Sequence, residues 1–431
     1  MTQQGTNPAG RLGTGREARP GLSQTFSALK YKDYRYLWAS SAFVSSGNQI
    51  QQITMGWLVF QLTGSPFWVG TVLGIRALPI LVVGPLAGVA VDRLDRKKLF
   101  LAAQLSLVVL ALLFALDVRF GQVNVYHALV FSFLLGLDSS LNQTVRQSLV
   151  VNTVAPQDLT NAIALNNLAG GVVQSIAPLI SGVLIAVLGV SGNFFIQSAT
   201  YLIVFLIILP MRTPYREAPA APFPRRATPA SVGTSFMEGI RHIQSDLPLL
   251  LLIILVIIPS IFVHSTQNLL SVFAVEVLHG GPRVLGLLGA CTGIGSLMAT
   301  FTLASLGNPQ IRGMLNMVSI LLVTVALTLF GLSSHLGLSL VLIAILGFFN
   351  TGFHLVNNAL VQSRTPDALR GRITSIYVLD HGFQPVGSLL LGFLAGEGVL
   401  GIQKAVVLAG IVAFAVTVYI GLRFRQLWRL A

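Results

Sequence analysis

The chain is dominated by apolar segments of about 20 residues, the length at which an α-helix crosses the hydrocarbon core of a bilayer. Six such segments lie in the first half of the 431-residue sequence and six in the second half. They cover residues 37–60, 68–91, 99–117, 125–150, 162–188 and 193–210, then 248–275, 284–305, 313–332, 337–362, 373–395 and 402–423. Because backbone polar groups within lipid must be satisfied internally, this pattern predicts an all-α membrane protein with twelve transmembrane helices.

The composition agrees with this class, since 54% of the residues are hydrophobic and only 10% are charged, against about 25% charged residues in soluble domains. The net charge of +13 would point to nucleic acid in a soluble protein. Here the Lys and Arg residues lie mainly in short loops on one side of the predicted segments, and the other side has only Arg119, Arg283 and Lys404. The positive-inside rule explains this asymmetry. We therefore expect both termini in the cytoplasm and no nucleic-acid partner.

The apolar segments and the stretches between them divide the chain into five parts. We expect a disordered cytoplasmic tail at 1–34, an N-terminal six-helix bundle at 35–210, a cytoplasmic linker at 211–245, a C-terminal six-helix bundle at 246–424 and a cytoplasmic tail at 425–431. The linker is rich in Pro, which is typical of an irregular connection. Within it, Phe236, Ile240 and Ile243 recur at helical spacing, so this part is either a short helix on the inner leaflet or a solvated loop.

The two halves repeat each other at a slowly drifting offset. An offset of 216 residues pairs Gln51 with Gln267, Gln52 with Asn268 and Gly70 with Gly286. Offsets of 211 and then 210 pair Gly136 with Gly347, Ser139 with Asn350, Gln143 with His354, Arg146 with Asn357 and Gly182 with Gly392. Most of these pairs are polar residues or glycines, for which chance matches are rarer than among apolar residues. Two parallel six-helix repeats indicate a transporter whose halves rock about a central site.

A charged motif follows the second predicted segment. Its members are Gly88, Asp92, Arg93, Arg96 and Lys97, and Asp95 stands where the usual pattern has glycine. This run resembles the G-x-x-x-D-R-x-G-R-[RK] loop of the major facilitator superfamily. The stretch 366–372 is similar to the P-x-x-x-R-G-R loop of the branch that includes the enterobactin exporter, and 177–182 resembles a helix-5 motif of drug exporters. The resemblance implies two pseudo-symmetric six-helix bundles in the cell membrane, with helices 1, 4, 7 and 10 around a central cavity.

Polar residues lie on these four helices at spacings that place them on shared faces. The candidate cavity residues are Asn48, Gln51, Gln52, Asp138, Asn142, Arg146, Gln267, Asn350, His354 and Asn357. Polar groups at membrane depth usually face a bundle interior or water. His264 and Asn268 extend the helix-7 face, and Asp380 with His381 on helix 11 form a second titratable pair.

The charged members of this set allow opposite roles. Asp138 either accepts a proton or a cationic substrate, or is a structural hydrogen-bond acceptor. Arg146 either tunes that carboxylate or binds an anionic group, or it snorkels to the inner interface. Arg76 is either a cavity cation or the partner of Asp117 or another acid.

The charged motif is expected to act as a conformational latch. Asp92 would dock on the start of helix 11, near Arg372, because a helix N-terminus has unpaired N–H groups and a partial positive charge. Arg93 and Arg96 would hold the loop to carboxylates or lipid phosphates, with Gly88 and Lys97 completing the motif. The alternative is a charge cluster that only sets membrane topology.

The sequence favours a secondary active transporter that works by alternating access and exports a small amphiphilic molecule, such as a siderophore, drug or metabolite, in exchange for protons. No G-x-x-x-x-G-K-[ST] loop is present, so we expect no nucleotide, cofactor or metal. Its partners would be the substrate and membrane lipids, and the protein would be a monomer. The alternatives are a facilitator or a lipid or lysolipid transporter of the same fold, a membrane-embedded transferase using Asp92 and Asp95, and a sensor or assembly partner that does not transport.

Overall fold

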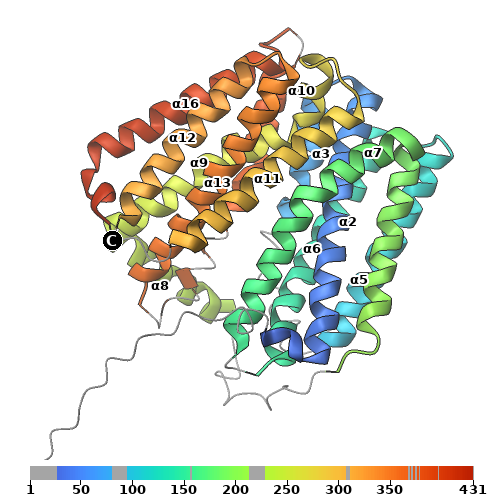
Figure 1. Cartoon of the computed structure of the whole chain (residues 1–431), viewed down its shortest axis with the longest axis horizontal. Helices are drawn as coiled ribbons and strands as arrows, with labels where there is room; N and C mark the ends of the chain where they lie inside the picture. Colours follow the sequence, from blue (N-terminus) through green and yellow to red (C-terminus); the bar gives the residue numbers. More distant parts are fainter. Residues whose placement is uncertain are drawn as a thin grey trace, which may run out of the picture.

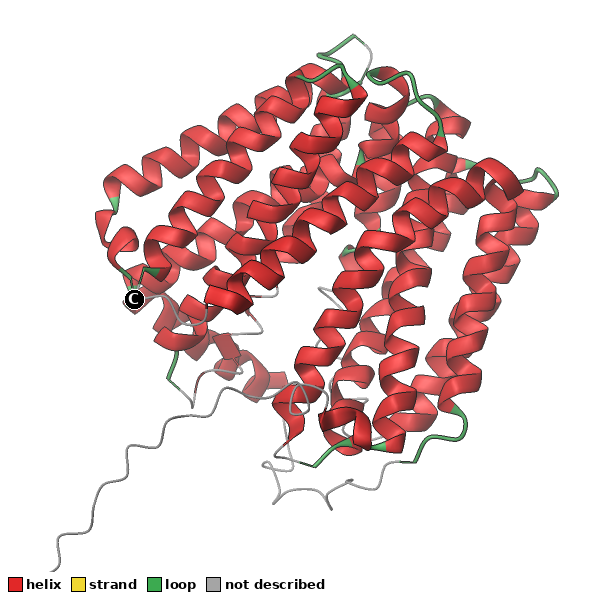
Figure 2. Cartoon of the chain, in the orientation of Figure 1, coloured by secondary structure: helices red, strands yellow, loops and turns green. Residues whose placement is uncertain are grey.

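The computed structural model describes residues 27–79, 95–155, 158–212, 229–306, 311–366, 369, 372–373, 376–377, 379–396 and 398–430. All regular elements in these ranges are helices (Figure 2). Seven helical stretches among them are long and apolar enough to cross a membrane by length and composition, and the shorter apolar helices α3 and α15 belong to two further predicted segments. This confirms the predicted all-α membrane class.

The N-terminal half contains one short 3₁₀ helix and five α-helices in the described ranges. They are η1 (Ser27–Lys30), α2 (Lys32–Thr63), α3 (Pro66–Ile75), α5 (Arg96–Arg119), α6 (Val125–Thr153) and α7 (Leu159–Ile208). Helix α7 covers two of the predicted segments. They are separated at Gly189, whose φ of 73° and ψ of 178° interrupt the helix and let the chain turn. A positive φ costs little for glycine, which explains why the turn occurs there.

The C-terminal half repeats this order with more interruptions. Its elements are α8 (Pro229–Ser245), α9 (Leu247–Asn268), α10 (Leu270–Glu276), α11 (Pro282–Leu306), α12 (Arg312–Leu332), α13 (Leu336–Arg364), η4 (Leu379–Phe383), α15 (Gln384–Leu394), α16 (Ile402–Arg423) and η5 (Arg425–Arg429). The predicted segment 248–275 is divided at Leu269, where φ is −95° and ψ is 11°. Helix α8 occupies the end of the predicted linker, so this part is helical rather than an irregular loop.

Residues 27–34, which the prediction had assigned to a disordered tail, are structured. Ser27, Lys30 and Tyr31 each reach the carboxylate of Asp158 at 2.7 Å, and Tyr34 is fully buried. The hydrogen bonds from Lys30, Ser27 and Tyr31 lower the pKa of Asp158 to about 2. These partners are about 130 residues apart in the chain, so a local reading of a polar stretch could not detect them.

The predicted repeat appears as two equivalent helix crossings between the halves. A Cβ added to Gly70 of α3 would lie 2.2 Å from the carbonyl oxygen of Ser388 and 3.5 Å from the Cα of Gly392. A Cβ on Gly286 of α11 would lie 2.9 Å from the carbonyl oxygen of Pro178 and 3.0 Å from the Cα of Gly182. Since Gly70 pairs with Gly286 and Gly182 with Gly392 in the repeat, the α3–α15 and α7–α11 contacts are related by the pseudo-symmetry. This confirms the internal repeat.

Among the described residues, apolar packing joins the two halves at one end. The largest core cluster contains Phe194 from the N-terminal half and Phe273 from the C-terminal half. At the other end the cores are separate, one around Tyr34 and one around Phe353. In Figure 1 the joined end is at the top, near α10, and the separated end is at the bottom, near α8. The chain enters α2 and leaves α16 at the separated end, which the loop charges predict to be cytoplasmic.

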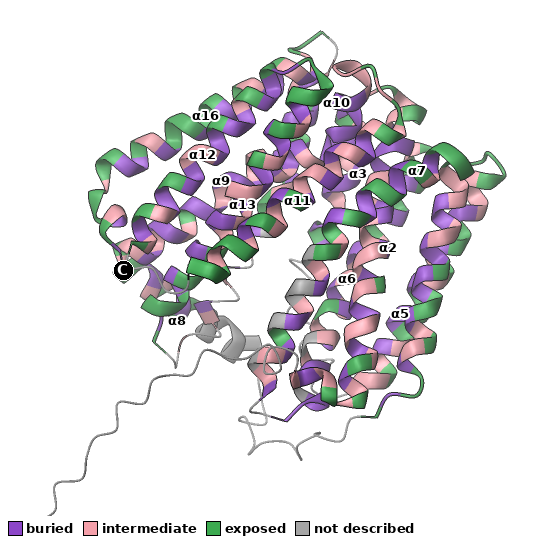
Figure 3. Cartoon of the chain, viewed as in Figure 1, coloured by how far each residue is buried: buried purple, intermediate pink, exposed green. Residues whose placement is uncertain are grey.

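The outer faces of the helices are apolar, as expected for a surface covered by lipid. Leu113 on α5 and Leu422 on α16 are 59% and 69% exposed. Figure 3 shows exposed positions recurring along both of these helices. A soluble monomer rarely has such large contiguous apolar surfaces.

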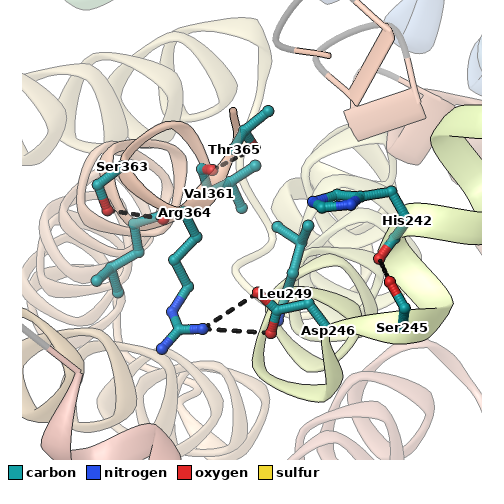
Figure 4. A network of polar contacts seen from close by, with 9 residues as sticks. His242, Ser245, Asp246, Leu249, Val361, Ser363, Arg364 and Thr365 are labelled. Carbon is teal, nitrogen blue, oxygen red and sulfur yellow. Dashed lines mark hydrogen bonds and ion pairs between the residues drawn. The ribbon is translucent and has the colours of Figure 1, made fainter. Parts of the chain in front are cut away.

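At the separated end of the C-terminal half, α9 is tied to α13. Arg364, the last residue of α13, donates to both carboxylate oxygens of Asp246 at 3.2 Å (Figure 4). Asp246 also accepts from the backbone N–H of Leu249 at 3.3 Å, which caps the start of α9. Both halves therefore have an ion pair at the entry to their first long helix. In the N-terminal half the base, Lys30, precedes the helix and pairs with Asp158, whereas in the C-terminal half the acid, Asp246, precedes the helix and pairs with Arg364.

Candidate transport cavity

A cavity of about 270 Å³ lies between the two halves. Helices α2, α3 and α7 contribute to it from the N-terminal half, and α9, α10, α11 and α13 contribute from the C-terminal half. Its amide side chains are Gln49, Gln52, Gln174, Gln267, Asn268 and Asn350. We call this space the central cavity. Its position agrees with the central site expected from the repeat.

Polar contacts close the central cavity toward the joined end. Gln52 Nε2 donates to Asn268 Oδ1 at 3.1 Å, and Asn268 Nδ2 donates to Ser388 Oγ at 2.9 Å. Ser271 Oγ also donates to the carbonyl oxygen of Gly56 at 3.0 Å. Gln52 and Asn268 are equivalent residues of the repeat, so their hydrogen bond joins the same position of the two halves.

Two histidines line the C-terminal side of the central cavity. The rings of His264 on α9 and His354 on α13 are stacked, with centroids 5.8 Å apart and planes at 22°. No Asp or Glu is among the lining residues in the described part of the chain. Imidazole is therefore the titratable group that this lining offers near neutral pH.

A second cavity of about 180 Å³ lies within the N-terminal half, among α2, α3, α5 and α6. Asn48, Arg76, Asn142 and Arg146 line it. Arg76 donates to Asn48 Oδ1 at 2.9 Å, to Ser139 Oγ at 3.4 Å and to Gln51 Oε1. We call this space the N-half cavity.

Asp117 is not the partner of Arg76. It lies near the end of α5 and contacts His127 Nδ1 at 2.8 Å. The guanidinium of Arg76 instead contacts neutral oxygens, because the chain brings α2 and α6 side chains around it.

Four of the predicted site residues, Gln51, Asp138, Asn357 and Asp380, line neither cavity and have structural partners. Asp138 is 7% exposed and accepts from Ser106 Oγ on α5 at 2.5 Å. Asn357 is fully buried and donates to the carbonyl oxygen of Leu252 at 3.2 Å. Asp380 accepts from Ser260 Oγ at 3.0 Å. The side chain of His381, and hence the predicted pair with Asp380, lies outside the described residues.

The remaining predicted residues are divided between the two cavities. Gln52, Gln267, Asn350 and His354 line the central cavity. Asn48, Asn142 and Arg146 line the N-half cavity, and Gln51 is fully buried behind it as an acceptor for Arg76. The sequence had placed all of them around one site.

Only part of the predicted latch can be located, since Gly88, Asp92 and Arg93 lie outside the described residues. Arg96 donates to Asn152 Oδ1 at 2.7 Å, and Lys97 donates to the carbonyl oxygen of Leu209 at 2.6 Å. The Arg96 contact differs from the expected carboxylate or lipid partner, and no partner had been predicted for Lys97.

Asp95, the departure from the family pattern, has a local role at this corner. Its carboxylate accepts from the backbone N–H of Lys98 at 3.1 Å and so caps α5. An aspartate is among the preferred residues at this position of a helix.

Several residues that line the central cavity were not among the predicted cavity residues. Gln49, Gln174, Thr292 and Ser296 all line the central cavity. A polar residue within a membrane helix is more often an ordinary interhelical contact than a site residue. Thr292 had one available signal, because the 216-residue offset pairs it with Arg76.

Two repeated helical bundles around a shared polar cavity define a secondary membrane transporter. The comparison with known families gives the particular assignment. Residues 23–427 match the family model described as transmembrane secretion effector, so the chain belongs to this family of the major facilitator superfamily. It is a multi-pass transporter of the cell membrane and not an enzyme.

Several characterised proteins are similar to the chain over most of its length. The staphyloferrin A transporter of Staphylococcus aureus is 26% identical over 389 residues, covering 89% of this chain and 94% of that protein. The multidrug efflux pump Tap of Mycolicibacterium fortuitum is 26% identical, with 85% and 91% covered. The enterobactin exporter EntS of Citrobacter koseri is 26% identical, with 80% and 79% covered.

Solved structures show the same fold at lower sequence identity. A POT family transporter in complex with a thioalcohol-conjugated peptide superimposes with a TM-score of 0.72 at 11% identity, covering 91% of this chain and 96% of that chain. A bacterial homologue of the lysosomal transporter Spinster gives a TM-score of 0.68 at 15% identity, with 95% and 97% covered. At these identities the similarity concerns the fold alone.

Proposed function

We propose that this protein exports a small amphiphilic molecule from the cytoplasm through the central cavity, by alternating access and in exchange for protons. The observation that carries the proposal is the central cavity itself. Both halves line it, and among the described residues polar contacts between Gln52, Asn268 and Ser388 close it at the joined end. A site of this kind can open to one side and then the other when the halves rock.

The substrate class and direction are supported by the similar proteins. Their names include a staphyloferrin A transporter, a multidrug efflux pump and an enterobactin exporter. All three names describe transport of small molecules, and two describe efflux. The lining is also suitable, because its many amides and hydroxyls offer hydrogen bonds among apolar walls.

The arrangement of the cores supports an inward-facing state. The two halves share one core at the joined end and have separate cores at the end where the basic loops lie. In this state a cytoplasmic substrate would enter from the end near α8.

Proton coupling is supported by titratable groups in the transport region. His264 and His354 lie in the central cavity, and Asp138 is buried within the N-terminal half. An imidazole has an ordinary pKa of about 6.5, so it exchanges protons near physiological pH. Protonation of the stacked pair would place like charges close together and so would favour a state in which the two rings separate.

A facilitator of the same fold is the second candidate. It is favoured by the absence of any Asp or Glu among the described residues that line the central cavity. The two candidates differ in one measurable property, because a facilitator cannot move its substrate against a concentration gradient.

The experiment has two stages. Metabolites inside and outside cells with and without the protein are compared to find the substrate, and its flux is then measured in proteoliposomes. We expect accumulation against the substrate gradient when a pH gradient is imposed, and collapse of that accumulation when a protonophore is added. Accumulation that is the same with and without the protonophore would exclude proton coupling. Metabolite profiles that are the same in cells with and without the protein would exclude export.

A further inference from the structure

We propose that the N-half cavity is an anion-binding site, in which Arg76, Arg146 and Asn142 hold one carboxylate of a small organic molecule. The second part of the inference, which rests on the proposed function, is that this carboxylate belongs to the transported molecule. The substrate would then be an organic anion rather than a cation.

Among the described residues, the cavity has several hydrogen-bond donors but no anionic group to receive them. The partners of Arg76 in this part of the chain are neutral oxygens, those of Asn48, Gln51 and Ser139. In the described part of the chain, Arg146 forms no ion pair or hydrogen bond, and no Asp or Glu lines this cavity. Two cations at membrane depth without a counter-ion are costly, and a bound anion removes that cost.

An amide of the same cavity points to the same ligand. Asn142 is 4% exposed, and its Nδ2 has no hydrogen-bond partner among the described residues. The unused atom is a donor, as are the two guanidinium groups. A buried donor without a partner is rare in folded proteins, and a carboxylate oxygen would satisfy it.

Asp138, the acidic residue of α6 that is closest in sequence, forms no ion pair with the arginines of the N-half cavity. Asp138 lies one turn from Asn142 in the sequence, but it accepts from Ser106 on α5 and does not line the N-half cavity. The cavity therefore keeps the charge of its two arginines.

The fold itself does not require these cations. The repeat pairs Arg76 with Thr292 and Arg146 with Asn357. The equivalence is structural, because a Cβ on Gly136 would lie 2.2 Å from the carbonyl oxygen of Arg76 and a Cβ on Gly347 would lie 2.3 Å from that of Thr292. The same crossing is thus built in the C-terminal half with neutral side chains, which leaves a ligand as the reason for arginine.

The size and position of the cavity indicate that it holds one group of a larger molecule. Its volume of about 180 Å³ is below the roughly 300–1,000 Å³ typical of pockets for drug-sized ligands. Asn48 lines the N-half cavity and Gln52 lines the central cavity. These residues are one helical turn apart on α2, about 6 Å along the axis. A carboxylate bound at the arginines can therefore belong to a molecule whose remainder lies in the central cavity.

The test compares two ligands of nearly equal shape that differ in charge, 4-fluorobenzoate and 4-fluorobenzamide. Their binding to the full chain, in nanodiscs of zwitterionic phosphatidylcholine, is measured by ¹⁹F NMR. We expect the wild-type protein to bind the benzoate about tenfold more tightly than the benzamide, because charge-assisted hydrogen bonds are stronger than neutral ones. Equal binding of the two ligands, or no binding of either, overturns the proposal.

The first variants replace each cavity arginine with the residue at the equivalent position of the C-terminal half. Arg76→Thr and Arg146→Asn should each reduce the preference for the benzoate to about twofold or less. Arg119→Gln, which removes an exposed arginine at the end of α5, is the matched control and should keep the full preference. A preference that survives in both cavity variants overturns the proposal.

Charge-retaining variants make the result independent of any folding defect. Arg76→Lys and Arg146→Lys should keep part of the preference, since lysine has the charge but not the planar fork of arginine. If both lysine variants lose it as completely as the neutral ones while remaining monodisperse, the arginines act structurally and the proposal fails.

This measurement also separates the inference from the proposed function. It needs no pH gradient and no flux, so an arginine-dependent anion preference can stand even if proton-coupled export is disproved. Conversely, export of a neutral or cationic molecule with no anion preference in the NMR assay would remove the inference and leave the transporter assignment intact.

Discussion

The N-terminal half has Arg76 and Arg146 where the C-terminal half has Thr292 and Asn357. The reverse holds for the imidazoles, since His264 and His354 of the C-terminal half replace Asn48 and Gln143. The glycine-mediated crossings, by contrast, are alike in the two halves.

The difference teaches that packing and chemistry have separate requirements. Close helix crossings depend on small residues at a few backbone positions, and both halves have glycine there. The side chains that face the cavities have no such restriction. We therefore expect the N-terminal half to provide recognition of an anionic group and the C-terminal half to provide the response to protons.

The largest effect should come from disturbing the crossings that the halves share. Gly70→Ala would place a methyl group 2.2 Å from the backbone oxygen of Ser388. Overpacking costs about 1–3 kcal/mol, and the backbones must separate. We expect a melting temperature lowered by about 5 °C and a large loss of export, measured by thermal unfolding and by proteoliposome flux.

The pseudo-symmetric position sharpens this comparison. Gly286→Ala would meet a backbone oxygen at 2.9 Å and should be milder than Gly70→Ala. Gly337→Ala has no atom within 4 Å of the new methyl group and should behave as wild type. An equal effect at Gly70 and Gly337 would show that the crossings are not limited by close packing.

The next effect concerns the imidazoles. The double variant His264→Asn/His354→Gln gives the C-terminal half, at these two positions, the side chains of the N-terminal half. We expect the double variant to transport its substrate down a gradient while losing the stimulation by a pH gradient at least fivefold, about the lower limit of typical coupling between sites. Flux at several pH values measures this.

The control is His335→Gln, which changes an exposed histidine in the loop before α13. That variant should keep the full pH dependence. If the cavity double variant also keeps it, the protons are coupled elsewhere, and Asp138 becomes the next residue to test by Asp138→Asn.

A smaller effect is expected at the contact that joins the halves. Gln52→Ala removes the hydrogen bond to Asn268, which contributes net about 0.5–1.5 kcal/mol and should shift the inward-to-outward equilibrium about two- to tenfold. Distances between spin labels at Gln122→Cys and Ser334→Cys, in a Cys291→Ser background, report opening of the joined end.

Gln362→Ala is the matched control, because Gln362 pairs with Asn358 within a single helix. It should leave the label distances unchanged. Identical distance distributions for Gln52→Ala and wild type would mean that the Gln52–Asn268 contact does not favour the inward-facing state.

The smallest effect concerns the ion pairs at the helix entries. Asp158 has a pKa of about 2 rather than 3.8, because Lys30, Ser27 and Tyr31 hydrogen-bond to its carboxylate. A pKa lowered in the folded state means that this carboxylate stabilises the fold above about pH 4 and that the contribution is lost as the pH falls toward 2. Asp158→Asn should lower the melting temperature at neutral pH by about 2 °C and remove that part of the acid dependence.

Hydrogen exchange of residues 27–31 measures the same contact directly. It should increase in wild type when the pH falls through this range, and it should be high in Asp158→Asn at every pH once intrinsic exchange rates are divided out. Protection that is equal in the two proteins at neutral pH would contradict the assigned role of Asp158.

The sequence allowed the class, the repeat and many cavity residues to be predicted, because each depends on a pattern that survives in one dimension. The 216-residue offset paired Gln52 with Asn268, and these side chains are in contact in the structure. The predictions were less accurate where contacts join distant segments. The hydrogen-bond partners of Arg76 could not be predicted from the sequence, and neither could the division of the polar residues between two cavities.

By itself, the sequence determined that this protein crosses the membrane many times and that its two halves share one plan, since hydrophobic length and residue spacing depend only on order along the chain. The tertiary structure decided which polar side chains face the shared cavity and which face the cavity of one half. That choice depends on helix rotation and on where kinks such as those at Gly189 and Leu269 occur. Rotation and kinks follow from packing between helices that are far apart in the sequence, and no local pattern records them.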